Sequence, residues 1–228
     1  MMVAGAPLDL TLKSRVEETY GIQLLNCYGI TECSPTISSV RPGQPKNDQT
    51  VGSLVSGVQG RVVKLDGSVA MAGEVGELHV RGPNVMLGYY HAPDLTAAAV
   101  DGEGWFKTGD LARIDGDCLY IVGRAKEMII RSGFNVYPAE VEAVINSHPA
   151  VIQSAVVGKP VSSNEEVIAF VQLQANSEIG VDDLASYINP LLTPYKRPSQ
   201  IIKLEALPAT STGKILKSKL AASLLESQ

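Results

Sequence analysis

Apolar residues spaced four apart predict a helix over residues 8–20. They would share one face of that helix, because 3.6 residues complete a turn. Asp9 is a typical N-cap, since its carboxylate can accept a hydrogen bond from a backbone N–H of the first turn. Gly21 is typical of the position just beyond a helix, and the apolar run 23–28 then predicts a buried strand. The apolar residues of the repeat are Leu8, Leu12, Val16 and Tyr20.

Short apolar runs separated by glycine turns occupy the middle of the chain, from about 51 to 122. Asp-Gly pairs at 66–67 and 115–116 are typical of tight turns between strands. This texture predicts a β-rich unit with strands at 61–65, 76–81 and 119–122.

The pattern changes after Gly123, where a hairpin over 128–136 precedes a helix that begins at Pro138. Proline suits the first position of a helix, because its missing N–H would have no partner there. We therefore predict two domains, residues 1–123 and 124–228, the second an α+β domain of ordinary size. Its further elements are expected as strands at 151–157, 166–173 and 201–204 and helices at 181–191 and 215–225.

Composition and charge exclude several classes of protein. The 228 residues are 45% hydrophobic, and 24 acidic against 19 basic residues give a net charge of −5, which argues against nucleic-acid binding. Apolar runs stay well short of the roughly 20 residues that span a membrane. The three cysteines contain no C-x-x-C pair, which argues against a zinc ribbon or a disulfide framework and favours a cytoplasmic protein.

Two short motifs carry candidate binding chemistry. The segment Tyr28-Gly29-Ile30-Thr31-Glu32 follows a buried strand and offers a stacking ring, a hydroxyl and a carboxylate of the kind that ligates Mg²⁺. An ordinary strand-to-loop turn is the alternative. Asp110, after Thr108 and Gly109 in an expected turn, could accept hydrogen bonds from two vicinal ribose hydroxyls.

Two further segments suggest movement and anion binding. Residues 123–127 (Gly-Arg-Ala-Lys-Glu) could be a hinge around Lys126 or merely a charged linker. Residues 208–214 form a polar glycine loop ending in Lys214, whose ammonium could meet a phosphate or a carboxylate. The loop is no P-loop, because Pro208 and Ile215 replace required residues. No metal-binding histidine site is expected, because His79, His91 and His148 lack any shared spacing.

Six motifs, in this order, resemble those of the AMP-forming acyl-CoA synthetases in the adenylate-forming superfamily. The resemblance implies a remnant of a large domain's α/β layer with a β-rich subdomain, then a small mobile α+β lid. It also implies activation of a carboxylic acid by ATP to acyl-AMP, followed by transfer to coenzyme A. The motifs are Tyr28–Glu32, Gly76–Pro83, Gly88–Tyr90, Gly104–Leu111, Gly123–Glu127 and Pro208–Lys214.

The resemblance also implies roles for individual residues. The first loop, Gly5-Ala6-Pro7, and Gly29 would adjoin the nucleotide, and Tyr28 would stack on adenine. Thr31 would contact phosphate and Glu32 would ligate Mg²⁺. The remaining roles are Asp110 and Arg124 at the ribose, Lys126 as the pivot, Lys214 between the ATP phosphate and the acid in the first step only, and Gly133 and Phe134 along the coenzyme A channel.

The family carries a phosphate loop and most of its acyl pocket upstream of a loop equivalent to Gly5. Nothing in this chain matches them, so we expect a C-terminal portion of a synthetase that is inactive in isolation. The alternatives are an adenylation domain serving a carrier-protein thiol and a non-catalytic fragment whose apolar 8–27 region allows a homodimer. The partners expected are a small carboxylic acid, ATP and coenzyme A.

Overall fold

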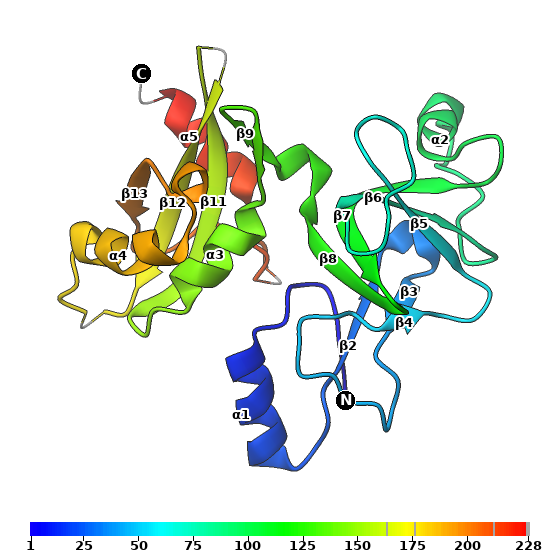
Figure 1. Cartoon of the computed structure of the whole chain (residues 1–228), viewed down its shortest axis with the longest axis horizontal. Helices are drawn as coiled ribbons and strands as arrows, with labels where there is room; N and C mark the ends of the chain where they lie inside the picture. Colours follow the sequence, from blue (N-terminus) through cyan, green and yellow to red (C-terminus); the bar gives the residue numbers. More distant parts are fainter. Residues whose placement is uncertain (163, 176, 212, 227–228) are drawn as a thin grey trace. The chain divides into compact units, whose positions relative to one another are not determined.

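The chain folds as two compact units, residues 1–125 and 126–228, in a computed structural model (Figure 1). The structure describes residues 1–226 except 163, 176 and 212. The division lies two residues beyond the domain boundary expected from the sequence. Among the described residues, no helix combines the length and apolar character that crossing a bilayer requires.

A small mixed sheet and helix α1 (Leu10–Tyr20) open the first unit. Asp9 caps α1 by accepting a hydrogen bond from the backbone of Leu12 at 2.7 Å, and Gly21 follows with a φ of 63°, as predicted. The sheet has the order β1-β2-β3-β4, with β1 parallel to β2 and the other pairs antiparallel. Its strands are β1 (Met2–Val3), β2 (Leu25–Gly29), β3 (Thr36–Ser39) and β4 (Ser53–Leu54).

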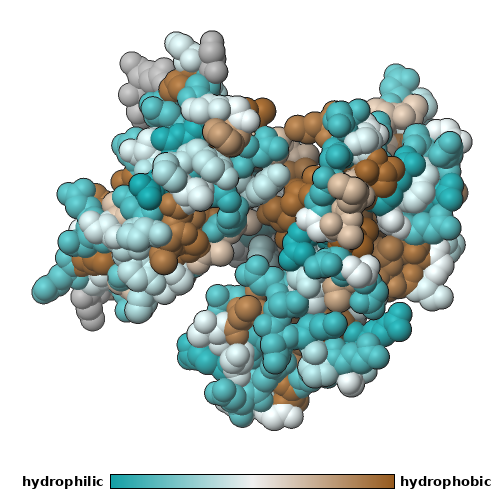
Figure 2. Space-filling view, viewed as in Figure 1, coloured by the Kyte–Doolittle hydropathy of each residue, from teal (hydrophilic) through white to brown (hydrophobic). Residues whose placement is uncertain are grey.

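The apolar residues of the four-residue repeat differ in their burial, with Leu8, just before α1, only 8% exposed. Leu12 and Tyr20 are 53% and 70% exposed, and hydrophobic residues lie scattered among hydrophilic ones on the surface around α1 (Figure 2). Lys13 is buried instead, paired with Glu17 at 3.0 Å. Glu17 also accepts a hydrogen bond from the backbone of Leu24 at 2.8 Å, so a polar stripe joins α1 to the segment before β2.

The rest of the first unit is an antiparallel sheet of order β5-β6-β7-β8, with the short helix α2 (Pro93–Ala99) before β7. One face packs on a core that includes Leu78, Val80 and Leu119. Strand β7 was not predicted, because Gly109 was interpreted as part of a turn. The strands are β5 (Gln59–Val63), β6 (Gly76–Arg81), β7 (Phe106–Asp115) and β8 (Cys118–Arg124).

The turn expected at Thr108–Asp110 is a bulge inside β7. His79 faces Lys107 and Glu77 faces Leu111 across β6 and β7, so three residues of β7 lie opposite one residue of β6. Gly109 has a φ of +70°, a conformation that glycine adopts without steric cost.

The second unit is built on the sheet β11-β12-β13, with β12 antiparallel to β11 and parallel to β13. One core cluster joins residues of α3 and α4 to this sheet, and another joins residues of α5 to it, so the sheet is buried on both faces. The elements are α3 (Pro138–Asn146), β11 (Val151–Val161), β12 (Asn164–Leu173), α4 (Val181–Ile188), β13 (Gln200–Lys203) and α5 (Lys217–Glu226).

The hairpin predicted at 128–136 is present as β9 (Ile129–Arg131) and β10 (Phe134–Val136). Ser132 and Gly133 form its two-residue turn with φ values of 52° and 81°. Two successive positive φ angles match the twist of paired strands.

Candidate active site

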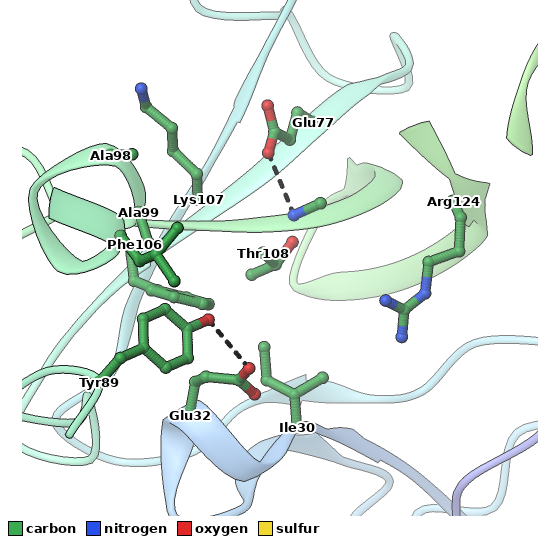
Figure 3. Close-up of a pocket in the computed structure, with 12 residues that line it drawn as sticks. Ile30, Glu32, Glu77, Tyr89, Ala98, Ala99, Phe106, Lys107, Thr108 and Arg124 are labelled. Carbon is green, nitrogen blue, oxygen red and sulfur yellow. Dashed lines mark hydrogen bonds between the residues drawn. The ribbon is translucent and has the colours of Figure 1, made fainter. Parts of the chain in front are cut away.

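A pocket of about 580 Å³ opens in the first unit, where the end of β2 meets α2 and the second sheet. Figure 3 shows its lining, which combines polar groups with an apolar wall from α2. The polar groups come from the segment after β2, from β6 and from the ends of β7 and β8. They include Glu32, Glu77, Lys107, Thr108 and Arg124.

Asp110 is a carboxylate only 3% exposed, and it lies between two predicted site residues. Its Oδ1 is 2.7 Å from Nε of Arg124, which lies directly opposite it on β8. Its Oδ2 accepts a 2.5 Å hydrogen bond from the hydroxyl of Tyr28 at the end of β2. The structure therefore brings three predicted residues together from two sheets.

Burial, together with the negative charge of Asp110, raises the pKa of Tyr28 far above its usual value. Tyr28 therefore keeps its proton and donates to the carboxylate, which also fixes the orientation of its ring. The guanidinium of Arg124 compensates the charge that Asp110 carries into the protein interior.

Glu32 lines the pocket from the 3₁₀ turn Thr31–Cys33. Its Oε1 accepts a hydrogen bond of 3.1 Å from the hydroxyl of Tyr89 (Figure 3). Thr31 is exposed at the start of the turn, whereas Cys33 at its end is fully buried. Burial raises the pKa of the Cys33 thiol to about 11, so it is neutral and inert near pH 7.

The predicted glycines and the first loop do not line the pocket. Gly29 is required by backbone packing, because a Cβ there would lie 1.9 Å from the carbonyl oxygen of Pro35. Gly5, Ala6 and Pro7 form an exposed loop between β1 and α1.

Four predicted residues belong to the second unit, whereas the pocket belongs to the first. Lys126 is the first residue of that unit and is exposed in the turn Ala125–Glu127. Phe134 follows Gly133 in the hairpin and stacks on Tyr195, with ring centroids 4.6 Å apart and planes at 21°. Lys214 is exposed at the end of a loop, where its backbone N–H donates to the hydroxyl of Thr210 at 3.1 Å.

The carboxylate of Glu32 suits a magnesium ion that arrives with a nucleotide. No group of three or more His, Cys, Asp or Glu residues is placed to hold a metal ion within the described part of the chain. Magnesium commonly binds one or two carboxylates together with substrate phosphates and water, so the single carboxylate of Glu32 fits this ion.

Sequence reasoning missed Tyr89 and Glu77 as residues of this site. Tyr89 lies in the Gly88-Tyr89-Tyr90 motif, one of the six that carry the family resemblance, but no role was predicted for it. Glu77 accepts a hydrogen bond from the backbone of Gly109 at 3.1 Å, and Gly109 lies in the bulge of β7.

Models of two consecutive parts of one enzyme family match the chain. Residues 1–90 match the AMP-binding enzyme family, and residues 140–214 match the AMP-binding enzyme C-terminal domain. The chain belongs to the AMP-binding enzyme family. Membership in this adenylate-forming family confirms the resemblance stated from the six motifs.

Relatives of known name support this membership. The chain is 38% identical over 217 residues to a long-chain-fatty-acid–CoA ligase of Salmonella typhimurium, an alignment that covers 95% of the chain and 38% of the ligase. The chain thus spans about two fifths of the length of that relative.

Solved structures confirm the predicted fold class, an α/β part followed by an α+β part. The ATP-bound structure of MatB from Rhodopseudomonas palustris superposes with a TM-score of 0.90 at 32% identity, over 97% of this chain and 44% of that one. The anthranilate CoA ligase AuaEII in complex with anthranoyl-AMP gives a TM-score of 0.89 at 29% identity, over 100% and 45%.

Proposed function

We propose that this chain supplies nucleotide-binding residues and the C-terminal lid of an AMP-forming acid–thiol ligase that makes acyl-CoA. The observation that carries the proposal is the buried Asp110 carboxylate, held by Arg124 and Tyr28 beside a pocket that contains Glu32. The ring of Tyr28 suits an adenine, Asp110 and Arg124 suit a ribose, and Glu32 suits a magnesium ion beside a phosphate. Named relatives that ligate acids to CoA support the same reaction.

In the first half-reaction, a carboxylate oxygen of the acid attacks the α-phosphorus of ATP. The bond from that phosphorus to pyrophosphate breaks, and acyl-AMP remains. Tyr28, whose ring orientation is fixed by its hydrogen bond to Asp110, stacks on adenine, while Asp110 and Arg124 bind the ribose. Thr31 contacts phosphate, with the Gly5–Pro7 loop and Gly29 near the nucleotide.

This step brings two anions together, so its barrier is largely electrostatic. Bound through Glu32, Mg²⁺ would supply positive charge that offsets the repulsion. Lys214 supplies a second positive charge, between the phosphate and the acid. Because Lys214 sits in an exposed loop of the second unit, it can be withdrawn when the lid turns at Lys126.

In the second half-reaction, the coenzyme A thiol loses its proton and attacks the acyl carbonyl, and the bond to AMP breaks. Gly133 and Phe134 line the channel for the pantetheine arm. Gly133 has no side chain and therefore leaves room for this arm. We place the reaction in the cytoplasm, in keeping with the three free cysteines. Association of two copies stays a prediction.

The test is acid-dependent exchange between ATP and pyrophosphate by the full-length protein, over acids from long-chain fatty to aromatic. Exchange that requires one class of acid, followed by thioester formation on added coenzyme A, is the expected result. Transfer to a carrier protein but not to coenzyme A would favour an adenylation domain. Absence of exchange with every acid would overturn the proposal.

A further inference from the structure

The Gly88-Tyr89-Tyr90 motif has no role in the mechanism above, yet it reaches the pocket. Tyr89 is 57 residues from Glu32 in the sequence, and its hydroxyl donates to Glu32 Oε1 at 3.1 Å. Figure 3 shows the two side chains pointing toward one another at the edge of the pocket. The aromatic ring comes from the loop before α2, and the carboxylate comes from the turn after β2.

The loop that carries Tyr89 is fixed at its α2 end. The backbone N–H of Tyr89 donates to the hydroxyl of Thr96 at 2.9 Å, and this hydroxyl donates to the carbonyl of Ala92 at 3.0 Å. A Cβ at Gly88 would lie 2.7 Å from the side chain of Thr96, and its φ is +151°. Glycine at position 88 therefore permits the close approach that fixes the backbone of Tyr89.

The same loop also holds the turn that carries Glu32. The backbone N–H of Met86 donates to the carbonyl of Glu32 at 2.8 Å. The Asn84 side chain donates to the carbonyls of Cys33 at 3.2 Å and Thr36 at 3.0 Å. Residues 84–89 therefore bind the backbone of this turn as well as its carboxylate, and Tyr89 is the contact that reaches the functional group.

We propose that Tyr89 is a positioning residue that orients the Glu32 carboxylate for Mg²⁺, an inference that rests on the function proposed above. The last torsion of a glutamate side chain has a broad energy minimum, so a carboxylate without a partner samples many orientations. One hydrogen bond to Oε1 restricts that rotation. Partners that orient a metal ligand commonly change metal affinity by about 10–100-fold when removed.

The test is Tyr89→Phe in the full-length protein, with Tyr90→Phe as the matched control. Both changes remove one hydroxyl and keep the ring, and Tyr90 is 90% exposed. We measure Mn²⁺ binding by electron paramagnetic resonance with ATP present and the acid absent. Tyr89→Phe should weaken Mn²⁺ binding about tenfold. In the exchange assay it should raise the Mg²⁺ requirement and leave the KM of the acid unchanged.

A double variant decides whether the effect passes through Glu32. Glu32→Gln alone should weaken Mn²⁺ binding, and adding Tyr89→Phe to it should cause no further loss. Equal Mn²⁺ affinities for Tyr89→Phe and Tyr90→Phe would overturn the inference and leave the proposed function intact. If Glu32→Gln has no effect on metal binding, the role proposed for Glu32 itself is wrong.

Discussion

Asp110 follows directly on the glycine of the bulge in β7. The hydroxyl of Thr108 donates to the carbonyl of Leu78 at 2.7 Å and accepts from the backbone of Asp110 at 3.1 Å. These bonds hold the extra residues of the bulge and fix the backbone at Asp110 itself. A buried charge is costly without a partner, and Arg124 and Tyr28 both contact this carboxylate.

Asp110→Asn should weaken AMP binding by the full-length protein about tenfold or more, because hydrogen bonds to a charged group contribute about 1.5–3 kcal/mol. Isothermal titration calorimetry with AMP measures the change. Asp115→Asn is the matched control, since Asp115 lies on the same strand with a side chain 66% exposed. An equal, small loss in both variants would contradict the role of Asp110 at the nucleotide.

Two glycines with the same backbone conformation should respond differently to alanine. Gly52 and Gly67 have φ values of 81° and 82°, but a Cβ at Gly52 would lie 2.0 Å from the backbone of Ser39, whereas one at Gly67 meets nothing within 4 Å. Gly67→Ala should cost roughly 1–2 kcal/mol from its φ alone. Gly52→Ala should cost about 3 kcal/mol or more.

Urea unfolding of the 228-residue chain measures both costs, followed by the fluorescence of Trp105, the single tryptophan, which lies in the first unit. Equal losses of unfolding free energy in the two variants would mean that the backbone around Ser39 shifts at little cost to make room for the added Cβ.

At the scale of elements, the β9–β10 hairpin is fixed from two directions. Glu165 and Asn164 at the start of β12 accept hydrogen bonds from the backbone of Ile130 at 2.6 Å and Ser132 at 2.7 Å. Arg131 donates to the carbonyl of Arg197 at 2.5 Å. These hydrogen bonds connect the hairpin that carries Gly133 and Phe134 to β12 and to the segment around Arg197.

Phe134→Ala should raise the KM for coenzyme A by about tenfold and leave acyl-AMP formation unchanged, because only the second half-reaction uses the channel. Ile130→Ala is the matched control, since Ile130 belongs to the same hairpin and is 49% exposed. Thioester formation from supplied acyl-AMP isolates the step. A loss of exchange activity in Phe134→Ala would assign the ring to the first half-reaction instead.

Sequence periodicity predicted the elements whose signals are local. The ends of α1, the strand at 76–81, the hairpin and the start of α3 at Pro138 rest on caps, turns and alternation within a few residues. Elements that depend on tertiary packing were missed. Strand β7 contains a glycine that resembles a turn until the residues of β6 are beside it.

The packing face of α1 shows the same limit. The four-residue repeat predicted the helix, but it does not report that Lys13 is the buried residue of α1, where its ammonium pairs with Glu17. The six motifs predicted a set of site residues, and of these Glu32 and Arg124 line the pocket. The contacts among Tyr28, Asp110 and Arg124, and that of Tyr89 with Glu32, join residues far apart in sequence, which periodicity does not report.

At the scale of the whole molecule, the chain divides into its two compact units between residues 125 and 126. The second unit begins at Lys126, so a change of φ and ψ there would turn one compact body against the other. The proposed reaction needs such a turn, because the positive charge of Lys214 helps the first half-reaction and would hinder the departure of AMP in the second. Changes at the pivot, Lys126, should therefore affect the second half-reaction, and changes at Lys214 should affect the first.

Lys214→Ala in the full-length protein should lower acyl-AMP formation by about 10²–10³-fold, as loss of one preorganised donor commonly does. It should spare thioester formation from supplied acyl-AMP. Lys126→Pro should do the reverse, because proline fixes φ near −65° and restricts the pivot. Lys126→Ala, which removes the charge but keeps the backbone free, is the control and should retain both half-reactions. Equal slowing of both half-reactions by Lys126→Pro would contradict a pivot that only the second half-reaction needs.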